Sequence, residues 1–470
     1  MKKVMVAGAA LLLVGGIYAD NAAAAKAEPG VQLTGDARAR IIYKDKNYRS
    51  FFGNNAYKLA NGQEANYKSS TDMDSRVRLN ITGTAAGGAY AKARIRLAEG
   101  TSEDLDRDSG SRNSLKQENI WVDRAYIGIP FNENVTVEVG RYRSTYGPLK
   151  GGNFFYDDVS LAGVKGIITW KNVEINPFIE WMEDGITYRG TNSKGEKYTG
   201  YDFAEDNDAM RYGANIKAQL NENWLVGALL GYQTDERREF SAAEPKRAKQ
   251  NEGFFGSLYT AGKHGNFGLV AEFAVTEKGL NAFNSWRDDD ELGDIVSDHP
   301  IGSNDTGYGG YIYPTYTINQ LTLGLNLGFT VDGFMPDTAA GFVMLGNADG
   351  MPISVVDIGD YGDWLWAGLV VQYQVSEALK LTGNLVYADI DTWSEYGDGP
   401  GFYKANSKYN YMLDSAWEIS GILQYTISKG LDWYLIAGYM DPDVEAGPGY
   451  TGPVDDDATF AAYTKLELKF

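Results

Sequence analysis

The sequence predicts an all-β fold, a transmembrane antiparallel β-barrel of 18 strands, with 16 strands as the alternative. Two observations predict it. Apolar and polar residues alternate with a period of two over many segments of about ten residues, and the links between these segments alternate between long and short. No stretch approaches 18 consecutive apolar residues, so no membrane-spanning helix is expected. The mean hydropathy of −0.35 fits a barrel, because lipid-facing and lumen-facing residues average out.

The clearest alternation occurs in seven segments. In residues 321–332 every odd position is Leu, Phe or Val, whereas the even positions are Thr, Gly, Asn or Asp. Successive side chains of a strand point to opposite faces, so this strand has one apolar and one wet face. The other six segments are 31–43, 73–85, 89–98, 210–220, 417–427 and 458–470.

The links indicate how the strands are joined. The long links are 44–72, 99–118, 144–162, 183–208, 235–252, 277–306, 333–362, 390–414 and 441–457. The short links are 86–88, 132–134, 171–172, 221–223, 263–266, 319–320, 376–378 and 428–430. Outer-membrane barrels have short periplasmic turns and long extracellular loops, so an even strand count places both termini on the periplasmic side. The link 171–172 has the weakest turn signal of the short links, so the two strands that it joins could be one, and 16 strands is the alternative.

The N-terminus predicts export. Lys2 and Lys3 precede an apolar stretch, residues 4–17, and a run of alanines, residues 22–25, which is typical of a cleaved signal peptide. We expect a signal peptide of residues 1–25, with Ala27 as the alternative cleavage point, and a barrel of residues 26–470. Loss of the signal removes two lysines and Asp20, so the formal net charge moves from −20 to −21.

The composition excludes several classes of partner. The chain has no cysteine, which rules out disulfides, iron–sulfur clusters, thiolate metal sites and covalent haem. The strong negative charge argues against nucleic acid. The two histidines, His264 in a turn and His299 in a loop, offer no nucleophile–base pair in a barrel wall, so no catalysis and no cofactor are expected.

Positive charge is concentrated near the N-terminus. Twelve of the eighteen arginines lie between Arg38 and Arg143, and none follows Arg287. The cations on the polar parity of their strands are Arg38, Arg40, Arg76, Arg78, Lys92, Arg94, Arg96 and Arg124. A cation on the lipid face at the midplane costs about 2–4 kcal/mol, so the whole set facing outward would exceed the ~5–15 kcal/mol stability of a typical domain. We therefore expect an arginine ladder that faces the lumen. The alternative is that these arginines only pair with lumen carboxylates and fill space.

The long link 144–162 carries Phe154, Phe155 and Tyr156, followed by Asp157 and Asp158. An apolar cluster is unusual in a loop that stands in water. We therefore expect this third loop to fold into the lumen, with its aromatic rings on the wall and the two aspartates opposite the arginine ladder. An external loop with a hydrophobic patch is the alternative.

Residues 124–128, then 135–139, then Gly140 and Arg141 resemble the paired strands that precede the inward third loop of the general porins of Gram-negative bacteria. The resemblance implies a constriction with Arg141 on its basic side and Asp157 and Asp158 on its acidic side, and it suggests a homotrimer. General porins have 16 strands, whereas 18 strands resemble the sugar-specific porins. This departure leaves the solute open.

Arg141 and Arg143 fall on the same parity as the apolar residues Val135, Val137 and Val139, which is the lipid-facing parity. We expect a β-bulge or other irregularity at Gly140 that turns both arginines into the pore.

Further features predict the membrane partners. Phe470, in phase with Leu466 and Leu468, resembles the C-terminal signal that barrels present to the assembly machinery. Eight tryptophans near strand ends predict aromatic girdles at the lipid and lipopolysaccharide interfaces. They are Trp121, Trp170, Trp181, Trp224, Trp364, Trp366, Trp417 and Trp433. The acidic stretches 288–291 and 455–457 predict a solvated surface. Calcium binding or divalent bridging to lipopolysaccharide is the alternative there, but no EF-hand spacing is present, and no metal site is expected.

Together these features predict passive diffusion of small hydrophilic solutes and ions across the outer membrane. The basic ladder and the acidic third loop would form the constriction, with a transverse field and mixed ion selectivity. The alternatives are a substrate-specific channel for a sugar or an anion, and a structural or scaffolding barrel.

Overall fold

The computed structural model describes residues 28–48, 69–101, 120–183, 186–191, 197–202, 209–235, 253–277, 306–332, 334, 336, 342–346, 351–359, 362–392, 411–446 and 456–470. The predicted signal peptide, the acidic stretch 288–291 and His299 lie outside these residues. The strands are β1 (Gly30–Lys44), β2 (Ser70–Thr84), β3 (Tyr90–Thr101), β4 (Ile120–Asn132), β5 (Val135–Tyr146), β6 (Tyr156–Trp170), β7 (Val173–Glu183), β8 (Ile186–Thr191), β9 (Lys197–Asp202), β10 (Ala209–Asn221), β11 (Trp224–Asp235), β12 (Gly253–His264), β13 (Phe267–Thr276), β14 (Gly307–Ile318), β15 (Leu321–Val331), β16 (Gly362–Gln374), β17 (Leu379–Thr392), β18 (Tyr411–Ser428), β19 (Leu431–Ala446) and β20 (Thr459–Lys469).

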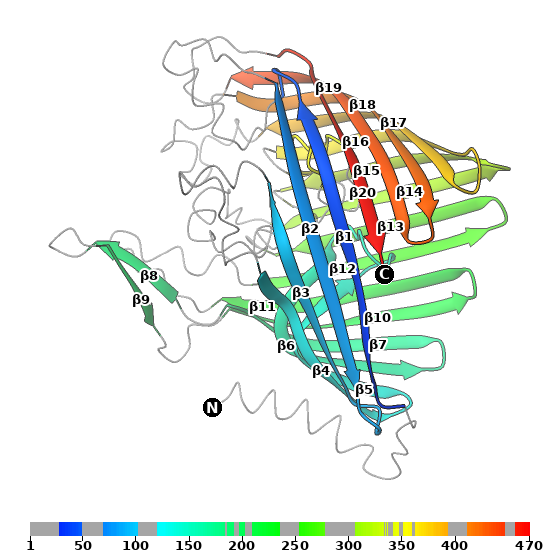
Figure 1. Cartoon of the computed structure of the whole chain (residues 1–470). Helices are drawn as coiled ribbons and strands as arrows, with labels where there is room; N and C mark the ends of the chain where they lie inside the picture. The colour runs from blue at the N-terminus through cyan, green and yellow to red at the C-terminus, as the bar shows by residue number, and fades with distance from the viewer. Residues whose placement is uncertain are drawn as a thin grey trace.

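Eighteen of these strands form one closed antiparallel sheet (Figure 1). The barrel closes where β1 pairs with β2 on one side and with β20 on the other. The predicted count of 18 is confirmed, and the alternative of 16 is wrong. β8 and β9 pair only with each other, in a hairpin within the link between β7 and β10 that the sequence analysis did not predict.

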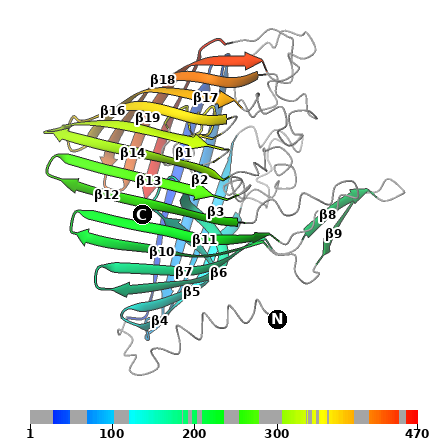
Figure 2. The ribbon, with the colours of Figure 1, turned by 180° about the vertical axis from the view of Figure 1, so that it is seen from behind.

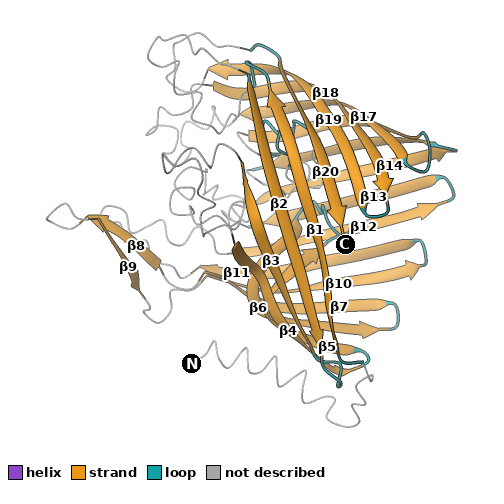
Figure 3. Ribbon diagram, in the orientation of Figure 1, coloured by secondary structure: helices purple, strands orange, loops and turns teal. Residues whose placement is uncertain are grey.

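The eight predicted short links are all tight turns, and they gather at one end of the barrel (Figure 2). Six of them are two-residue turns, and in two of these, Lys171–Asn172 and Asn319–Gln320, the first residue is not a glycine but has a positive φ, 55° at Lys171 and 52° at Asn319. Such left-handed residues are favoured in two-residue hairpin turns because they match the twist of the strands. Figure 3 shows how regularly the strands and turns follow one another.

The outer face of the barrel is apolar. Leu33, Leu230, Leu258, Leu365 and Ile419 each expose between 59% and 67% of their surface. A continuous exposed apolar surface of this kind is suited to lipid rather than to water. No helix among the described residues is long and apolar enough to cross a membrane.

The tryptophans divide between the two faces. Trp170 and Trp417 are 65% and 51% exposed, as a girdle requires. Trp364 and Trp366 are each only 2% exposed and point into the barrel, so their predicted place in a girdle is wrong. The inner face of β16 is apolar because other segments cover it, a condition that strand alternation alone does not reveal.

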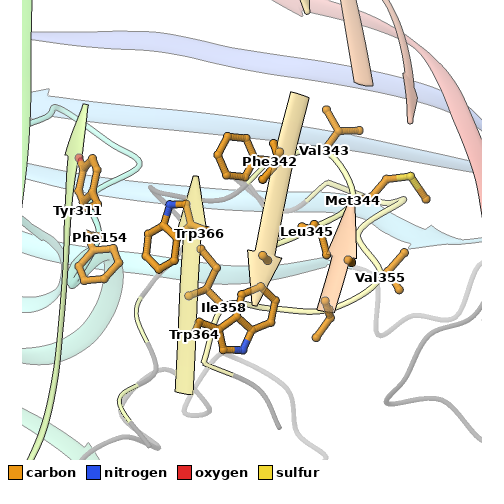
Figure 4. Packing of buried hydrophobic residues seen from close by; sticks show 14 of the residues in the cluster. Phe154, Tyr311, Phe342, Val343, Met344, Leu345, Val355, Ile358, Trp364 and Trp366 are labelled. Atoms are coloured by element: carbon orange, nitrogen blue, oxygen red, sulfur yellow. The ribbon is translucent and has the colours of Figure 1, made fainter. Parts of the chain in front are cut away.

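A hydrophobic core fills one side of the barrel interior. Side chains from the inner faces of β12 to β19 pack against residues of two links, 147–155 and 332–361 (Figure 4). Phe154 of the first link lies against Tyr311 and Trp366, with ring centroids 5.4 and 6.3 Å away. The barrel therefore has a dry half lined by β12 to β19, distinct from the half lined by β1 to β4.

Candidate functional site

The basic side chains singled out in the sequence lie on the inner faces of four neighbouring strands, β1 to β4. The register places Arg38 opposite Arg76 and Arg78 opposite Arg96. Their outward neighbours, such as Val77 and Ile95, are apolar. One side of the lumen is thus a continuous basic surface, here called the basic wall.

Three aspartates on the basic wall each bind two arginines. The triads are Asp74 with Arg38 and Arg40, Asp36 with Arg76 and Arg78, and Asp123 with Arg94 and Arg96. Arg78 Nε donates to Asp36 Oδ2 at 2.8 Å, and Arg96 Nε donates to Asp123 Oδ2 at 2.5 Å. Within each triad there are two arginines and one carboxylate, so the carboxylate pairing that was the alternative to a bare ladder is present. The role of the arginines in a constriction stays a prediction.

Asp123 was not among the predicted site residues. Simple alternation places Asp123 on the lipid parity, next to Arg124. The pairing shifts here, because Arg94 pairs with Arg124 whereas Ile95 pairs with Val122. Asp123 is the extra residue of this β-bulge, and its side chain is 1% exposed and bound to Arg94. A bulge of this kind re-aims a side chain. The sequence did carry a signal for this bulge, because simple alternation would leave the Asp123 carboxylate facing lipid.

β20 extends the basic wall past β1, with two lysines that were not among the predicted site residues. Lys465 and Lys469 flank Glu467, at 3.4 and 3.8 Å. The register sets Lys465 opposite Arg40 and Glu467 opposite Arg38. This group repeats the ratio of two cations to one carboxylate.

Aromatic rings accompany the cations of the wall. Lys465 Nζ lies 4.0 Å from the ring centroid of Tyr434, and Lys92 Nζ lies 4.8 Å from that of Tyr90. Cations are attracted to the faces of such rings. The rings therefore help to hold the cationic side chains against the wall.

Arg141 and Arg143 lie on β5. Gly140 has φ of +124°, so the expected irregularity is present, but β5 pairs with β4 and β6 without a register shift at this residue. The neighbouring side chains of Tyr142 and Ser144 are buried on the inner face. The expected bulge is therefore not found at Gly140. Arg141 Nε donates to Ser160 O at 3.1 Å, and Arg143 Nη2 lies 3.4 Å from the position of a Cβ at Gly151 in the third loop. The turn of both arginines into the pore stays a prediction.

The third loop folds into the barrel, as predicted. It is shorter than the expected 144–162, because Tyr146 still pairs with Tyr156, which leaves residues 147–155 as the link. The backbone N–H of Phe154 donates to Glu272 Oε2 on β13 at 3.1 Å. Phe154 also stacks on Phe334, with ring centroids 5.7 Å apart. The loop thus reaches from β5 and β6 to the wall formed by β13 and β14.

Asp157 stabilises the loop itself. Its carboxylate accepts hydrogen bonds from Gly152 N at 2.6 Å and from Asn153 Nδ2 at 3.3 Å. Gly152 has φ of +73°, a conformation that favours glycine. The backbone of Asp158 lies in β6, but its side chain lies outside the described residues.

A buried polar cluster at the base of the loop was also missed. Glu180 on β7 is fully buried and accepts hydrogen bonds from Ser144 Oγ, at 2.6 Å, and from the hydroxyl of Tyr156. Arg211 lies 5.7 Å from the Tyr156 ring and donates to Gln233 at 3.0 Å. Buried polar groups of this kind are retained only when they are paired. The cluster therefore fixes where the loop leaves β5 and enters β6.

No protein-family profile matches the chain, and no curated protein matches it. Among solved structures, OccK8 (OprE) of Pseudomonas aeruginosa aligns over 94% of this chain and 98% of its own length, with 12% identity and a TM-score of 0.50. The chain has the fold of the outer-membrane porins.

Two further structures were also found. The anion-selective porin from Comamonas acidovorans is 12% identical, with a TM-score of 0.43, over 94% of this chain and 100% of that one. OpdK of Pseudomonas aeruginosa, solved with vanillate, is 11% identical, with a TM-score of 0.48, over 93% of this chain and 98% of that one.

A barrel of porin fold with an apolar exterior belongs in the outer membrane, because closure satisfies every strand edge and lipid covers the outer face. The two sides of the barrel interior differ in how much of their surface is exposed to solvent. Arg78 on the basic wall remains 21% exposed, whereas Val386, Ala388 and Ile390 on the inner face of β17 are each 1% exposed. Water therefore reaches Arg78 on the basic wall but not these residues of β17.

Proposed function

We propose that this chain is a passive channel for small hydrophilic solutes and ions across the outer membrane. The observation that supports it is the row of arginine–aspartate triads inside a closed 18-stranded barrel, in which Arg78 and Arg96 remain 21% and 19% exposed. Barrels of 16 to 18 strands are wide enough to enclose water, unlike eight-stranded barrels that side chains fill.

The channel would favour anions where solutes pass the basic wall. Each triad carries one net positive charge, and a low-dielectric wall focuses such charges onto the lumen. Asp157 and Asp158 would supply the acidic side of the constriction. Acidic residues at the mouths would oppose the preference of the wall, which gives mixed rather than ideal anion selectivity.

The test is conductance in a planar bilayer. The purified barrel should form open, water-filled channels, and the absence of any conductance would overturn the proposal. The reversal potential in a KCl gradient should then move towards that of a cation-selective pore in the triple variant Arg38→Gln, Arg76→Gln, Arg94→Gln.

The matched control is Lys171→Gln, Lys263→Gln, Lys429→Gln. It removes the same charge from three exposed positions, two in turns (Lys171 and Lys429) and one next to the last residue of β12 (Lys263). We expect this control to shift the reversal potential much less. Equal shifts would show that net charge, and not the basic wall, sets the selectivity.

A second candidate is a channel specific for small organic anions. The pairing of cations with rings, such as Lys92 with Tyr90 and Arg96 with Trp121, favours it, because a ring and a cation together can bind an anion that also has an apolar part. Such a channel would show saturable block of its ion current by one class of carboxylate. Conductance that falls only in proportion to solute viscosity would exclude specific binding.

A further inference from the structure

The link between β15 and β16 contributes a compact structure to the barrel interior. Residues 342–346 and 351–359 of this link are here called the inner segment, and from the sequence an external loop was expected here. The two parts pair with each other through Val355 N to Met344 O and Gly346 N to Val356 O, both at 2.7 Å. The inner segment is therefore a folded unit rather than an extended strand of chain.

A single carboxylate holds one side of the inner segment. Glu418 on β18 is fully buried, and it accepts hydrogen bonds from three consecutive backbone N–H groups, those of Val343 at 3.0 Å, Met344 at 3.0 Å and Leu345 at 2.8 Å. Successive N–H groups make a concave site for an anion. Loss of the carboxylate would leave three buried donors without their acceptor, which is costly. Glu418 thus acts as a latch between the wall and the inner segment.

The wall is shaped to receive the same link. A Cβ atom added at Gly438 would lie 2.5 Å from Met344 Cγ, and one added at Gly368 would lie 2.5 Å from Phe342 Cζ. Both distances are far below van der Waals contact. The two glycines, on β19 and β16, therefore form sockets that any larger residue would fill. Figure 4 shows Phe342 and Met344 turned towards the wall strands on which they pack.

The opposite side of the inner segment reaches the seam of the barrel. The hydroxyl of Tyr48, just after β1, donates to Ser354 O at 2.6 Å, and that of Tyr463 on β20 contacts Met351 Sδ at 2.9 Å. Burial raises the pKa of Tyr48, which keeps this hydroxyl protonated as a donor. Tyr463 lies 6.0 Å from Arg40, so the segment ends beside the basic wall.

We propose that the inner segment is an internal plug, held by the Glu418 latch and the glycine sockets, that closes the side of the lumen lined by β16 to β19 and thereby sets the conductance of the pore. This inference rests on the proposed channel function. It assigns the width of the open path to a displaceable element, because the plug is joined to those strands by discrete side-chain contacts and not by a continuous strand ladder.

The first test replaces the latch. In planar bilayers, Glu418→Ala should raise the unitary conductance roughly 1.5- to 2-fold, because conductance follows the open cross-section. Glu138→Gln is the matched control, since Glu138 is another buried inner-face carboxylate but pairs with Lys165 at 2.7 Å. The control should keep the wild-type conductance. Gly438→Leu, which fills a socket, provides a second route to the same increase if Glu418→Ala does not assemble.

The second test locks the plug. The chain has no cysteine, so the pair Met344→Cys and Gly438→Cys introduces the only thiols. Met344 Cγ lies 2.5 Å from the position of a Cβ at Gly438, which places the two sulfurs within disulfide reach. In the Glu418→Ala background, oxidation should return the conductance to the wild-type value, and reduction should raise it again.

The outcomes separate the two proposals. A wild-type barrel that does not conduct would refute the channel function itself. A wild-type barrel that conducts, together with unchanged conductance in both the assembled Glu418→Ala and Gly438→Leu variants, would refute only the plug. Conductance that rises in the variant but does not respond to oxidation of the thiol pair would also count against displacement of the inner segment.

Discussion

Arg38 on β1 lies directly opposite Arg76 on β2, and each binds the aspartate of the other's strand. Asp74 on β2 forms an ion pair with Arg38, whereas Asp36 on β1 forms one with Arg76. This exchange relieves the repulsion between two facing cations, which would otherwise disfavour the pairing of β1 with β2. The four arginines and two aspartates of this exchange therefore stabilise the pairing of β1 with β2 while all six point to the inner face.

The first prediction concerns the charge of this exchange. Asp74→Asn should make the pore more anion-selective, because Arg38 and Arg40 lose the carboxylate that they share. One added net charge on the wall is worth about 1 kcal/mol at nearby positions in a medium of intermediate dielectric, so the chloride-to-potassium permeability ratio should rise a few-fold. Reversal potentials in a KCl gradient measure it. An unchanged ratio would mean that permeant ions do not pass near Asp74.

The second prediction concerns stability. Asp123 is 1% exposed and its partner Arg94 only 7%, so Asp123→Asn leaves a buried guanidinium without its carboxylate. Breaking a buried ion pair in this way costs about 3–5 kcal/mol. Urea unfolding of the refolded barrel should show a loss of this order. Glu133→Gln, in an exposed turn, should change the unfolding free energy by less than about 0.5 kcal/mol.

Strand alternation and loop lengths were sufficient to predict the number of strands and the facing of the arginines on β1 to β3, because the period of two and the cost of a charge in lipid leave one consistent register. They failed at Asp123, where a bulge interrupts the period. They also failed at Trp364 and Trp366. Alternation assigns these residues to a face, but only tertiary packing decides whether that face is dry.

The third loop and the inner segment show the same contrast. The cluster of Phe154 and Phe155 was recognised as unsuited to water, and its inward position follows. The stretch with Phe342, Met344 and Ile353 is equally apolar and carried the same signal, but its length suggested an external loop. No role could be predicted for Glu418, because it binds backbone N–H groups, which every residue except proline has and which the sequence therefore does not distinguish.

The third prediction tests the facing of β2. Leu79→Arg places a cation on the lipid-facing parity, at a cost of about 2–4 kcal/mol near the midplane. Asn80→Arg adds the same side chain one residue later, on the inner face opposite Arg94. Leu79→Arg should therefore reduce the yield of folded barrel in lipid vesicles, whereas Asn80→Arg should fold. Equal yields would contradict the assigned faces.

The fourth prediction concerns the third loop. Phe154 is fully buried between Tyr311 and Phe334. Phe154→Ala should lower stability by about 3–5 kcal/mol, the usual cost of such a truncation. It should also increase the noise and the mean conductance of single channels, because the loop loses its contact with the far wall. Leu149→Ala, at an exposed position of the same loop, is the control and should leave the conductance unchanged.

The fifth prediction concerns closure of the barrel. Phe470 N donates to Gly35 O at 3.0 Å and Phe470 O accepts from Gly35 N at 2.8 Å, so the last residue of the chain completes the seam with β1. The Phe470 ring covers Gly35, where an added Cβ would lie 2.6 Å from Phe470 Cζ and 2.5 Å from the backbone oxygen of Arg78.

Two variants separate packing at the seam from recognition of the C-terminus. Gly35→Val should weaken closure, because the Phe470 ring must move away from the seam, and heat-modifiable gel mobility should report a lower melting temperature for the folded barrel. Phe470→Ala keeps the backbone hydrogen bonds and removes the contact with the ring, but not the contact with Arg78 O, so the double variant should recover part of the stability in vitro. If Phe470 is also the assembly signal, that double variant will still accumulate poorly in the outer membrane of cells. Full recovery in cells would show that the ring serves the seam alone.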